Sequence, residues 1–192
     1  MKQIPIGLHG LARTGKDTAA NYLAHQYAFM AYAFATPLKT ALQLMFSLTE
    51  EQLNGALKEV PLANIGKSPR ELMQLLGTEW GRHLVHNDLW LLLARQQIDN
   101  VLSMNNEWIQ GFVISDVRFE NEAKWLRDQG GVVVHLQRPD AVAVNPHVSE
   151  AGVAVHDNDF VIHNDADLHH LYAQLDHLMV ILTRRQALRS AA

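Results

Sequence analysis

A glycine-rich loop between a predicted strand and a predicted helix constrains the fold of this chain more than any other feature. The loop covers residues 10–18 and reads Gly-Leu-Ala-Arg-Thr-Gly-Lys-Asp-Thr. Residues 3–9 before it form a short apolar run of strand length, and residues 17–29 after it carry apolar side chains at helical spacing. A loop in this position can point successive backbone amides into one cavity, which is an arrangement that binds phosphate.

The residues of this loop predict that it binds a nucleoside triphosphate. Gly10 and Gly15 allow the backbone angles that the loop needs, and Lys16 can reach the terminal phosphates. One position departs from the usual pattern, because Asp17 follows the lysine and the hydroxyl comes one place later, at Thr18. Since Mg²⁺ gives up its waters reluctantly, we expect Asp17 to hold the ion through a water and Thr18 to contact an inner phosphate. The alternative is a plain helix N-terminus, with Asp17 complementing the helix dipole.

Composition narrows the remaining classes of protein. With 192 residues and 48% apolar content, the chain suits a single compact domain that carries an insertion. The absence of cysteine excludes disulfides and thiolate metal sites, so a reducing cytoplasm is the expected compartment. We expect no secretory leader and no membrane association, because the apolar runs are too short. The net charge of -4 and the scattered basic residues favour small anions over polymeric nucleic acid as ligands.

Five apolar runs of strand length lie along the chain, and helical patterns separate most of them. The predicted strands cover residues 3–9, 31–35, 111–116, 132–137 and 160–163. This alternation predicts an α/β fold of three layers, with a mainly parallel five-stranded sheet, helices on both faces and ligands at the carboxyl ends of the strands. A last helix from Asp167 covers the sheet or forms a homodimer contact, and the side chains it is expected to bury are Leu168, Leu171, Leu175, Leu178 and either Val180 or Ile181.

The longest gap between predicted strands indicates a helical insertion at about residues 37–105, the natural place to bind a second substrate. Its four helical patterns cover residues 37–46, 50–58, 68–84 and 88–102. The clearest helix start is at Ser68, which can cap the helix while Pro69 fits the first turn and Glu71 completes a capping box.

The helix predicted over residues 68–84 carries the polar side chains that we expect to bind the second substrate. Arg70, Gln74 and Gly77 lie near one helical stripe, and Thr78 is next to it. An arginine can grip a phosphate with two hydrogen bonds, while an amide or a hydroxyl can recognise a base edge or a sugar.

Three residues of the insertion have a simpler alternative role. Arg70 and Arg82 could be solvated surface cations, which is the commoner case for single arginines on a helix. Trp90 stands among leucines on the next helix, so it is either a platform for a base or a core residue.

A second candidate site follows the predicted strand at residues 111–116, which ends in a carboxylate. Asp116 could orient a metal-bound water or bind a sugar hydroxyl, and Arg118 could bridge the donor and acceptor phosphates. Glu122 would lie on the next helix, within reach of the same pocket. The alternatives are a surface salt bridge between Asp116 and Arg118, and a helix-turn role for Glu122.

Several segments together resemble the phage-type deoxynucleoside monophosphate kinases. They cover residues 10–18, 35–39, 70–78, 116–118, 138–139, 147–152 and 161–165. The resemblance runs almost end to end, and it implies a P-loop fold of the nucleoside monophosphate kinase type. It also implies transfer of the terminal phosphate of ATP to a deoxynucleoside monophosphate. This chain has Ala12 at a position where some members of the family carry a lysine.

The resemblance also implies roles for individual residues. The residues expected to line the monophosphate site are Arg70, Gly77, Thr78, Trp90, Asp116, Arg118 and Glu122, to which our own interpretation adds Gln74. The loop and the last strands together supply the expected ATP site, which consists of Gly10, Ala12, Arg13, Thr14, Gly15, Lys16, Asp17, Thr18, Arg138 and Asn164.

Phosphate transfer of this kind needs few special groups. The acceptor phosphate has a second pKa of roughly 6, so it is already an anionic nucleophile and requires no general base. The protein must instead align the two substrates, neutralise charge and exclude water. We expect Lys16, Arg70 and Arg118 to do this together with Mg²⁺ and with Asp116.

The last strands are expected to hold the adenine base. Arg138 and Asn164 would flank the base, although both residue positions are also typical of ordinary turns. Arg127 and Arg138 are further candidates for a lid arginine, and their alternatives are a solvated helix residue and a cation at a strand end.

Two other functions stay open on the sequence. A P-loop kinase of the dephospho-coenzyme A kinase type would share the loop and the sheet but would phosphorylate a hydroxyl group. A regulatory module would bind ATP and hydrolyse it slowly without any acceptor.

Overall fold

The computed structural model describes residues 3–104, 108–141 and 152–190. These residues form two compact units. The first, here called the sheet unit, runs to Ala33 and resumes at Ile98, and the second, the helical unit, covers Phe34–Gln97. The helical unit lies where the sequence predicts an insertion, and it begins and ends a few residues earlier than 37–105.

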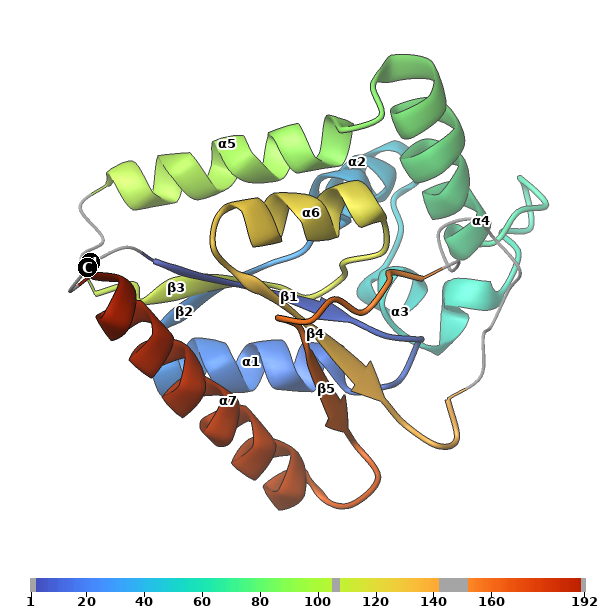
Figure 1. Cartoon of the computed structure of the whole chain (residues 1–192). Coiled ribbons are helices and arrows are strands. Elements are labelled where there is room, and N and C mark those ends of the chain that lie inside the picture. The colour runs from blue at the N-terminus through green and yellow to red at the C-terminus, as the bar shows by residue number, and fades with distance from the viewer. Residues whose placement is uncertain (1–2, 105–107, 142–151, 191–192) are drawn as a thin grey trace. The chain divides into compact units, whose positions relative to one another are not determined.

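Five parallel strands form the centre of the sheet unit (Figure 1). Their spatial order is β2 (Phe29–Tyr32), β3 (Gly111–Ile114), β1 (Ile4–His9), β4 (Val132–Gln137) and β5 (Phe160–His163). Every pairing between neighbouring strands is parallel, which confirms and sharpens the prediction of a mainly parallel sheet. The range 31–35 predicted for the second strand is wrong by two to three residues, because pairing with β3 places Phe29 opposite Gly111 and Tyr32 opposite Ile114.

Helices cover both faces of this sheet, as predicted (Figure 1). They are α1 (Lys16–Tyr27) and α7 (Leu168–Ser190) on one face and α6 (Glu120–Asp128) on the other. Side chains alternate along β1, so Ile6 and Leu8 enter the core beneath α1 and α7 while Gly7 faces α6. A Cβ atom on Gly7 would lie 2.3 Å from Leu126 of α6, so glycine lets α6 pack closely on the sheet.

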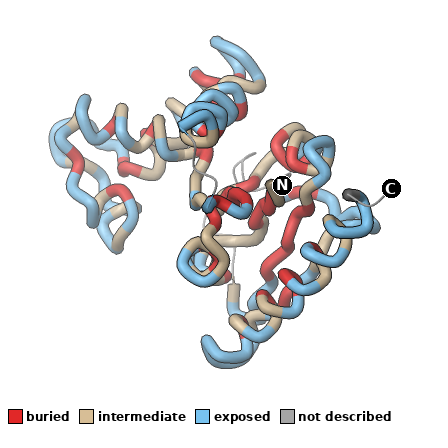
Figure 2. The backbone as a smooth tube through the Cα atoms, turned by 90° about the vertical axis from the view of Figure 1, so that its left-hand side faces the viewer, coloured by how far each residue is buried: buried red, intermediate tan, exposed pale blue. Residues whose placement is uncertain are grey.

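Burial in the sheet unit follows the strands and one stripe of α7 (Figure 2). The prediction for α7 holds for three leucines, since Leu171, Leu175 and Leu178 are buried, and Leu182 continues the same stripe. The prediction is wrong for Leu168, which is 56% exposed at the first position of the helix. Of the two alternatives Val180 and Ile181, Val180 is 48% exposed and Ile181 is half-buried.

The helical unit contains a series of short helices. They are α2 (Thr36–Phe46), α3 (Glu50–Leu53), the 3-10 helix η1 (Ala56–Glu59), α4 (Pro69–Gln74), the π-helix η2 (Leu75–Val85) and the first part of α5 (Leu89–Ser103). The helix predicted over 50–58 is therefore two helices, and they separate at Gly55. The predicted capping box is confirmed, because the Ser68 hydroxyl accepts from the Glu71 amide and the Glu71 carboxylate accepts from the Ser68 amide.

The predicted helix over 68–84 changes its winding after Gln74, where the π-helix begins. The indole of Trp90 lies across this helix and donates to the Gly77 carbonyl at 2.6 Å. At Gly81 a Cβ atom would lie 2.6 Å from the same ring, so glycine makes room for it. The wide winding thus accompanies the packing of one aromatic side chain, which no local pattern in the helix predicts.

Candidate active site

The loop over residues 10–18 connects β1 to α1, as predicted, and three of its residues have positive φ angles. Gly10 and Gly15 have φ of 148° and 97°, and Arg13 has φ of 65°. Glycine adopts such angles readily, whereas arginine pays about 1 kcal/mol or more for the left-handed region. The positive φ of Arg13 is a feature that the sequence does not reveal.

The two glycines are also required by close neighbours. A Cβ atom on Gly10 would lie 2.4 Å from the Leu136 carbonyl oxygen at the end of β4. A Cβ atom on Gly15 would lie 2.6 Å from Nδ2 of Asn164, just after β5. The loop is therefore packed tightly against the ends of two neighbouring strands, and a side chain at either position would displace it.

Two polar side chains bind the loop to itself. The hydroxyl of Thr14, which is buried, donates to the Leu11 carbonyl at 2.9 Å. The ammonium group of Lys16 donates to the carbonyls of Gly10 and Leu11 at 2.9 and 2.6 Å. Lys16 therefore bends back over the loop, and its positive charge lies where the backbone amides of the loop and the N-terminus of α1 also attract an anion.

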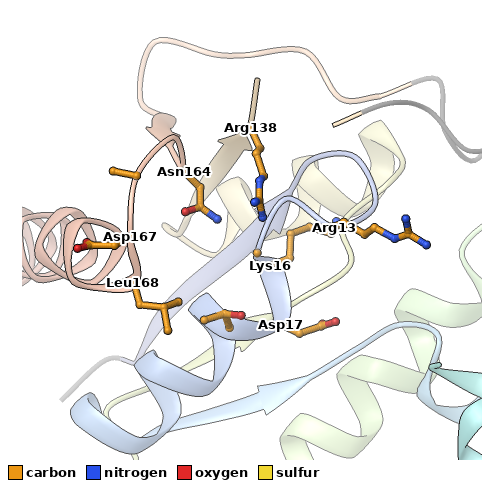
Figure 3. Close-up of a pocket in the computed structure, with 10 residues that line it drawn as sticks. Arg13, Lys16, Asp17, Arg138, Asn164, Asp167 and Leu168 are labelled. Carbon is orange, nitrogen blue, oxygen red and sulfur yellow. The ribbon is translucent and has the colours of Figure 1, made fainter. Parts of the chain in front are cut away.

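A pocket of about 600 Å³ opens beside this loop (Figure 3). Arg138 and Asn164 reach toward the loop from the ends of β4 and β5. Its lining consists of Arg13, Gly15, Lys16, Asp17, Thr18, Arg138, Asn164, Ala166, Asp167 and Leu168. The structure thus brings together seven of the ten residues that we expect to bind ATP. The other three, Gly10, Ala12 and Thr14, belong to the loop itself rather than to the pocket lining.

Asn164 links the last strand to the phosphate loop. Its side-chain amide donates to the Thr14 carbonyl at 3.0 Å, and its backbone amide donates to the Gln137 carbonyl at 2.8 Å. The sequence reasoning missed Ala166, Asp167 and Leu168, which line the same pocket. Their position could have indicated them, because they lie two to four residues after Asn164, and Leu168 is the first residue of α7.

The residues around Asp17 fit a magnesium ion bound mainly by phosphates. Both Asp17 and Thr18 line the pocket, one with a carboxylate and one with a hydroxyl. Among the described residues, no group of three His, Cys, Asp or Glu side chains could hold a metal ion alone. This donor set is typical of Mg²⁺, which takes one or two protein oxygens and completes its shell with waters and substrate phosphates.

Asp116 and Arg118 lie where the sequence predicts them, just after β3 in the sheet unit. The residues around them bind to the ends of the neighbouring strands, since Ser115 donates to the Tyr32 carbonyl at 3.0 Å and Val117 donates to the Leu8 carbonyl at 3.1 Å. Burial, together with the charge of Asp116, raises the pKa of the Tyr32 hydroxyl above its ordinary value. Asp116 and Arg118 are therefore held near the carboxyl end of β1, where the phosphate loop begins.

Glu122 is almost fully buried and caps the start of α6. Its Oε2 accepts from the backbone amides of Arg118 and Phe119 at 2.8 and 3.1 Å. The helix-turn role that the sequence left open is thus present in the structure. Through this bond Glu122 also fixes the backbone of Arg118, so a role for Glu122 at the substrate site can be indirect.

Arg127 is not the solvated helix residue that the sequence left as one alternative. Its guanidinium binds the carboxylate of Asp159, with Nη2 at 2.6 Å from Oδ2, and it also binds Glu120 and the Ala154 carbonyl. The Asp159 side chain is fully buried and accepts further bonds from the amides of Val133 and His156. Of the two lid candidates, Arg138 is the one that lines the pocket.

The remaining predicted residues lie in the helical unit. Arg70 forms an ion pair with Glu59, and only 12% of its side chain is exposed, so it is not a freely solvated cation. Nε2 of Gln74 is buried and has no hydrogen-bond partner among the described residues. Thr78 and Arg82 are buried as well, and so is Trp90, which is 7% exposed and therefore belongs to the core of the unit.

The π-helix affects how these polar residues align. In an α-helix, the residue four positions further on lies slightly past one full turn, whereas in the wider π-helix it lies slightly short of one full turn. Thr78 and Arg82, which follow Gln74 at intervals of four, therefore return toward the stripe that Arg70 and Gln74 begin.

Comparison with known proteins decides the family. The family model for deoxynucleotide monophosphate kinase matches residues 5–65 and 57–175, which is most of the chain. The chain belongs to this family. A relative in Acanthamoeba polyphaga mimivirus is 32% identical over 181 residues, covering 88% of this chain and 93% of that protein. The deoxynucleotide monophosphate kinase of Enterobacteria phage T4 is 24% identical over 242 residues, covering 92% of this chain and 99% of that protein.

Solved structures agree at the level of the fold. TT1252 from Thermus thermophilus superposes with a TM-score of 0.52 at 15% identity, over 95% of this chain and 99% of that one. A gluconokinase from Sinorhizobium meliloti superposes with a TM-score of 0.51 at 9% identity, over 98% of both chains. The P-loop kinase fold predicted from the sequence is thereby confirmed.

Of the segment 147–152 that contributes to the family resemblance, residues 147–151 lie outside the described residues, and Gly152 has a positive φ of 93°. None of the described helices is both long and apolar enough to cross a bilayer.

Proposed function

We infer that the protein transfers the terminal phosphate of ATP to a deoxynucleoside 5'-monophosphate and releases ADP and the deoxynucleoside diphosphate. The observation that carries this inference is the phosphate loop between β1 and α1, which opens on a pocket at the carboxyl ends of β1, β4 and β5. Membership of the deoxynucleotide monophosphate kinase family supports the choice of acceptor.

The donor nucleotide fits the pocket beside the loop. The triphosphate lies on the backbone amides of the loop and at the N-terminus of α1, where the helix dipole and Lys16 favour negative charge. The adenine lies between Arg138 and Asn164, and Ala166 and Leu168 supply apolar contact next to them. Arg13 and Arg138 add positive charge on the two sides of the loop.

Transfer depends on charge neutralisation rather than on proton abstraction. Lys16 changes its hydrogen bonds from the loop carbonyls to the phosphate oxygens, where negative charge builds up in the transition state. Asp17 would hold Mg²⁺ through a water, and the ion would neutralise charge on the donor phosphates, while Thr18 contacts an inner phosphate. Arg118 neutralises the acceptor side, and Asp116 orients the sugar or a water.

The helical unit contributes the groups that recognise the acceptor. Arg70 binds the acceptor phosphate in exchange for Glu59, and the buried amide of Gln74 and the hydroxyl of Thr78 recognise the base or sugar. Gly77 and Trp90 act together, since the indole is bonded to the Gly77 carbonyl and shapes the helix that carries these groups. A second ligand explains these buried polar groups better than a module that binds ATP alone.

A substrate panel tests the proposed function. ADP formation is measured with Mg²⁺ and ATP against deoxy- and ribonucleoside monophosphates and dephospho-coenzyme A, with a reaction that contains no acceptor as the control. Turnover that depends on deoxynucleoside monophosphates is expected. Turnover only with dephospho-coenzyme A would mean that this compound, and not a deoxynucleoside monophosphate, is the acceptor. ATP hydrolysis that does not depend on any acceptor would refute the kinase assignment.

A further inference from the structure

His9, the last residue of β1, lies directly before Gly10 and binds two distant segments with its two ring nitrogens. Nδ1 is 2.9 Å from the carbonyl oxygen of Val117, which stands between Asp116 and Arg118. Nε2 is 3.4 Å from the backbone nitrogen of Val153. One imidazole thus joins the start of the phosphate loop, the Asp116 to Arg118 segment and the segment that begins at residue 152.

These two contacts determine the protonation state of the ring. A carbonyl oxygen only accepts hydrogen bonds, so Nδ1 of His9 must carry the proton. A backbone amide only donates, so Nε2 must offer its lone pair to Val153. The neutral ring with its proton on Nδ1 satisfies both partners, and a doubly protonated ring would direct a second N–H against the amide of Val153.

The groups around the ring favour the neutral form. Burial, followed by the nearby His135, Lys16 and Arg118, lowers the pKa of His9 below its ordinary value, and the bond to Val117 opposes this only in part. The His135 ring of β4 meets His9 edge-on with 5.2 Å between centroids, and it faces Asp159 at 3.4 Å on its other side. From α1 and from the segment after β3, the charged groups that face His9 are the cations Lys16 and Arg118.

The backbone next to Arg118 is held from both sides. The amide of Val117 donates to the Leu8 carbonyl at 3.1 Å, and the carbonyl of Val117 accepts from His9. Both the backbone amide and the backbone carbonyl of Val117 are therefore bound to the last two residues of β1. Since β1 continues directly into the loop with Lys16, these two bonds tie the segment of Arg118 to the segment of Lys16, while Glu122 fixes the Arg118 amide to the start of α6.

We propose that His9, in its neutral form with the proton on Nδ1, is a positioning residue that holds the Asp116 to Arg118 segment in register with the phosphate loop. It contacts neither nucleotide. This inference rests on the proposed function, because it assigns Arg118 to the acceptor side. Losing the imidazole is then expected to impair use of the acceptor and the transfer step more than ATP binding, because the loop retains its own bonds through Thr14, Lys16 and Asn164.

The test compares His9→Leu, which removes both contacts, with His9→Asn, whose amide can still donate to Val117 and cannot titrate. A matched control is His25→Leu, because His25 is exposed near the end of α1. We expect His9→Leu to lower kcat/KM for the acceptor by about tenfold or more, since small displacements of aligned groups cost that much. The dissociation constant for ATP should change by less than about twofold, and His9→Asn should recover most of the activity near pH 8.

The pH profile separates positioning from a merely structural role. The acceptor phosphate titrates at roughly pH 6 in every variant. The fall of activity at acid pH should therefore involve two protons in the wild type, one on the phosphate and one on His9, and only one proton in His9→Asn. The ¹⁵N shifts of the ring, measured by NMR, should show the neutral Nδ1–H form at neutral pH, and this readout needs no activity.

Distinct outcomes refute the two assignments. If the wild-type protein turns over no deoxynucleoside monophosphate, the proposed function fails, whatever the His9 variants do. If the wild type is active and His9→Leu, folded by circular dichroism, matches it in acceptor kinetics, the positioning role is wrong. An Nε2–H tautomer in the NMR spectrum, or equal acid limbs for the wild type and His9→Asn, would refute it as well.

Discussion

Arg127 and Asp159 form a buried ion pair, and we expect removal of the Arg127 charge to lower the stability of the protein strongly. The Asp159 side chain is fully buried, and only 15% of the Arg127 side chain is exposed. Burial alone would raise the pKa of Asp159, but the bonds from Arg127, the amides of His156 and Val133 and the ring of His135 outweigh it and lower the pKa to about 2, from 3.8. A tenfold change in proton affinity corresponds to 1.36 kcal/mol, so the ionised Asp159 contributes roughly 2 kcal/mol to stability at neutral pH.

Arg127→Met keeps the apolar stem and removes the charge. The carboxylate of Asp159 then stays buried without its cation, a change that typically costs about 3–5 kcal/mol. Two backbone amides still bind Asp159, so we expect the lower end, about 3 kcal/mol. For a chain of this length, that loss lowers Tm by roughly 6–12 °C. Activity measured well below Tm should be nearly unchanged, because Arg127 is held within the sheet unit and does not line the pocket.

Urea unfolding followed by circular dichroism measures this loss, with Arg184→Met as the control because Arg184 is an exposed arginine on α7. The pH dependence supplies a second readout. In the wild type the contribution of Asp159 is fully present above about pH 4 and is lost as the pH falls from 3.8 toward 2. In Arg127→Met the pKa of Asp159 rises, so this loss begins at higher pH. Unfolding free energies of Arg127→Met and wild type that agree within about 0.5 kcal/mol, or a loss of kcat at unchanged stability, would refute the structural role and favour a lid role.

Three further substitutions test the site. Lys16→Ala should lower kcat by about 100-fold or more while the circular dichroism spectrum stays unchanged, since the ammonium acts on developing phosphate charge; near-normal turnover would contradict the loop assignment. Gly15→Ala, which strains a φ of 97° and meets Asn164, should weaken ATP binding about tenfold in a calorimetric titration, and unchanged affinity would show that the loop tolerates a side chain. Gly81→Ala should displace Trp90 and destabilise the protein by about 1–3 kcal/mol in urea, together with a raised KM for the acceptor. An unaltered urea midpoint would mean that the ring is loosely packed.

Much of the candidate donor site could be predicted from the sequence because its signals are local. The spacing of Gly10, Gly15 and Lys16 between an apolar strand and a helix predicts a phosphate-binding loop at this place, and the structure has a loop with positive φ at both glycines there. Arg138 and Asn164 could be placed because parallel strands bring their carboxyl ends to one edge, and both residues follow strands. Ala166 and Leu168 were missed because small and apolar side chains have no chemical signature of a nucleotide pocket, and only their position after Asn164 pointed to it.

Other features depended on packing between distant segments. The helix after Ser68 starts where its capping box predicts, but its π winding occurs where the indole of Trp90 bonds to Gly77 and packs against Gly81. The exact turn of Arg13 into a positive φ likewise reflects a loop confined between two strand ends.

The sequence by itself determined the phosphate loop, the alternation of strands and helices that makes a parallel sheet, and the family. Each of these can be recognised from particular residue types in short motifs or at regular spacings. Only the tertiary structure decided which partners the buried polar groups take. Arg127 meets Asp159 across 32 residues, and His9 meets Val117 and Val153 across 108 and 144 residues. The physical reason is that such bonds compensate the cost of burying charge and imidazole nitrogens, and that cost arises only once the sheet and its helices have excluded water.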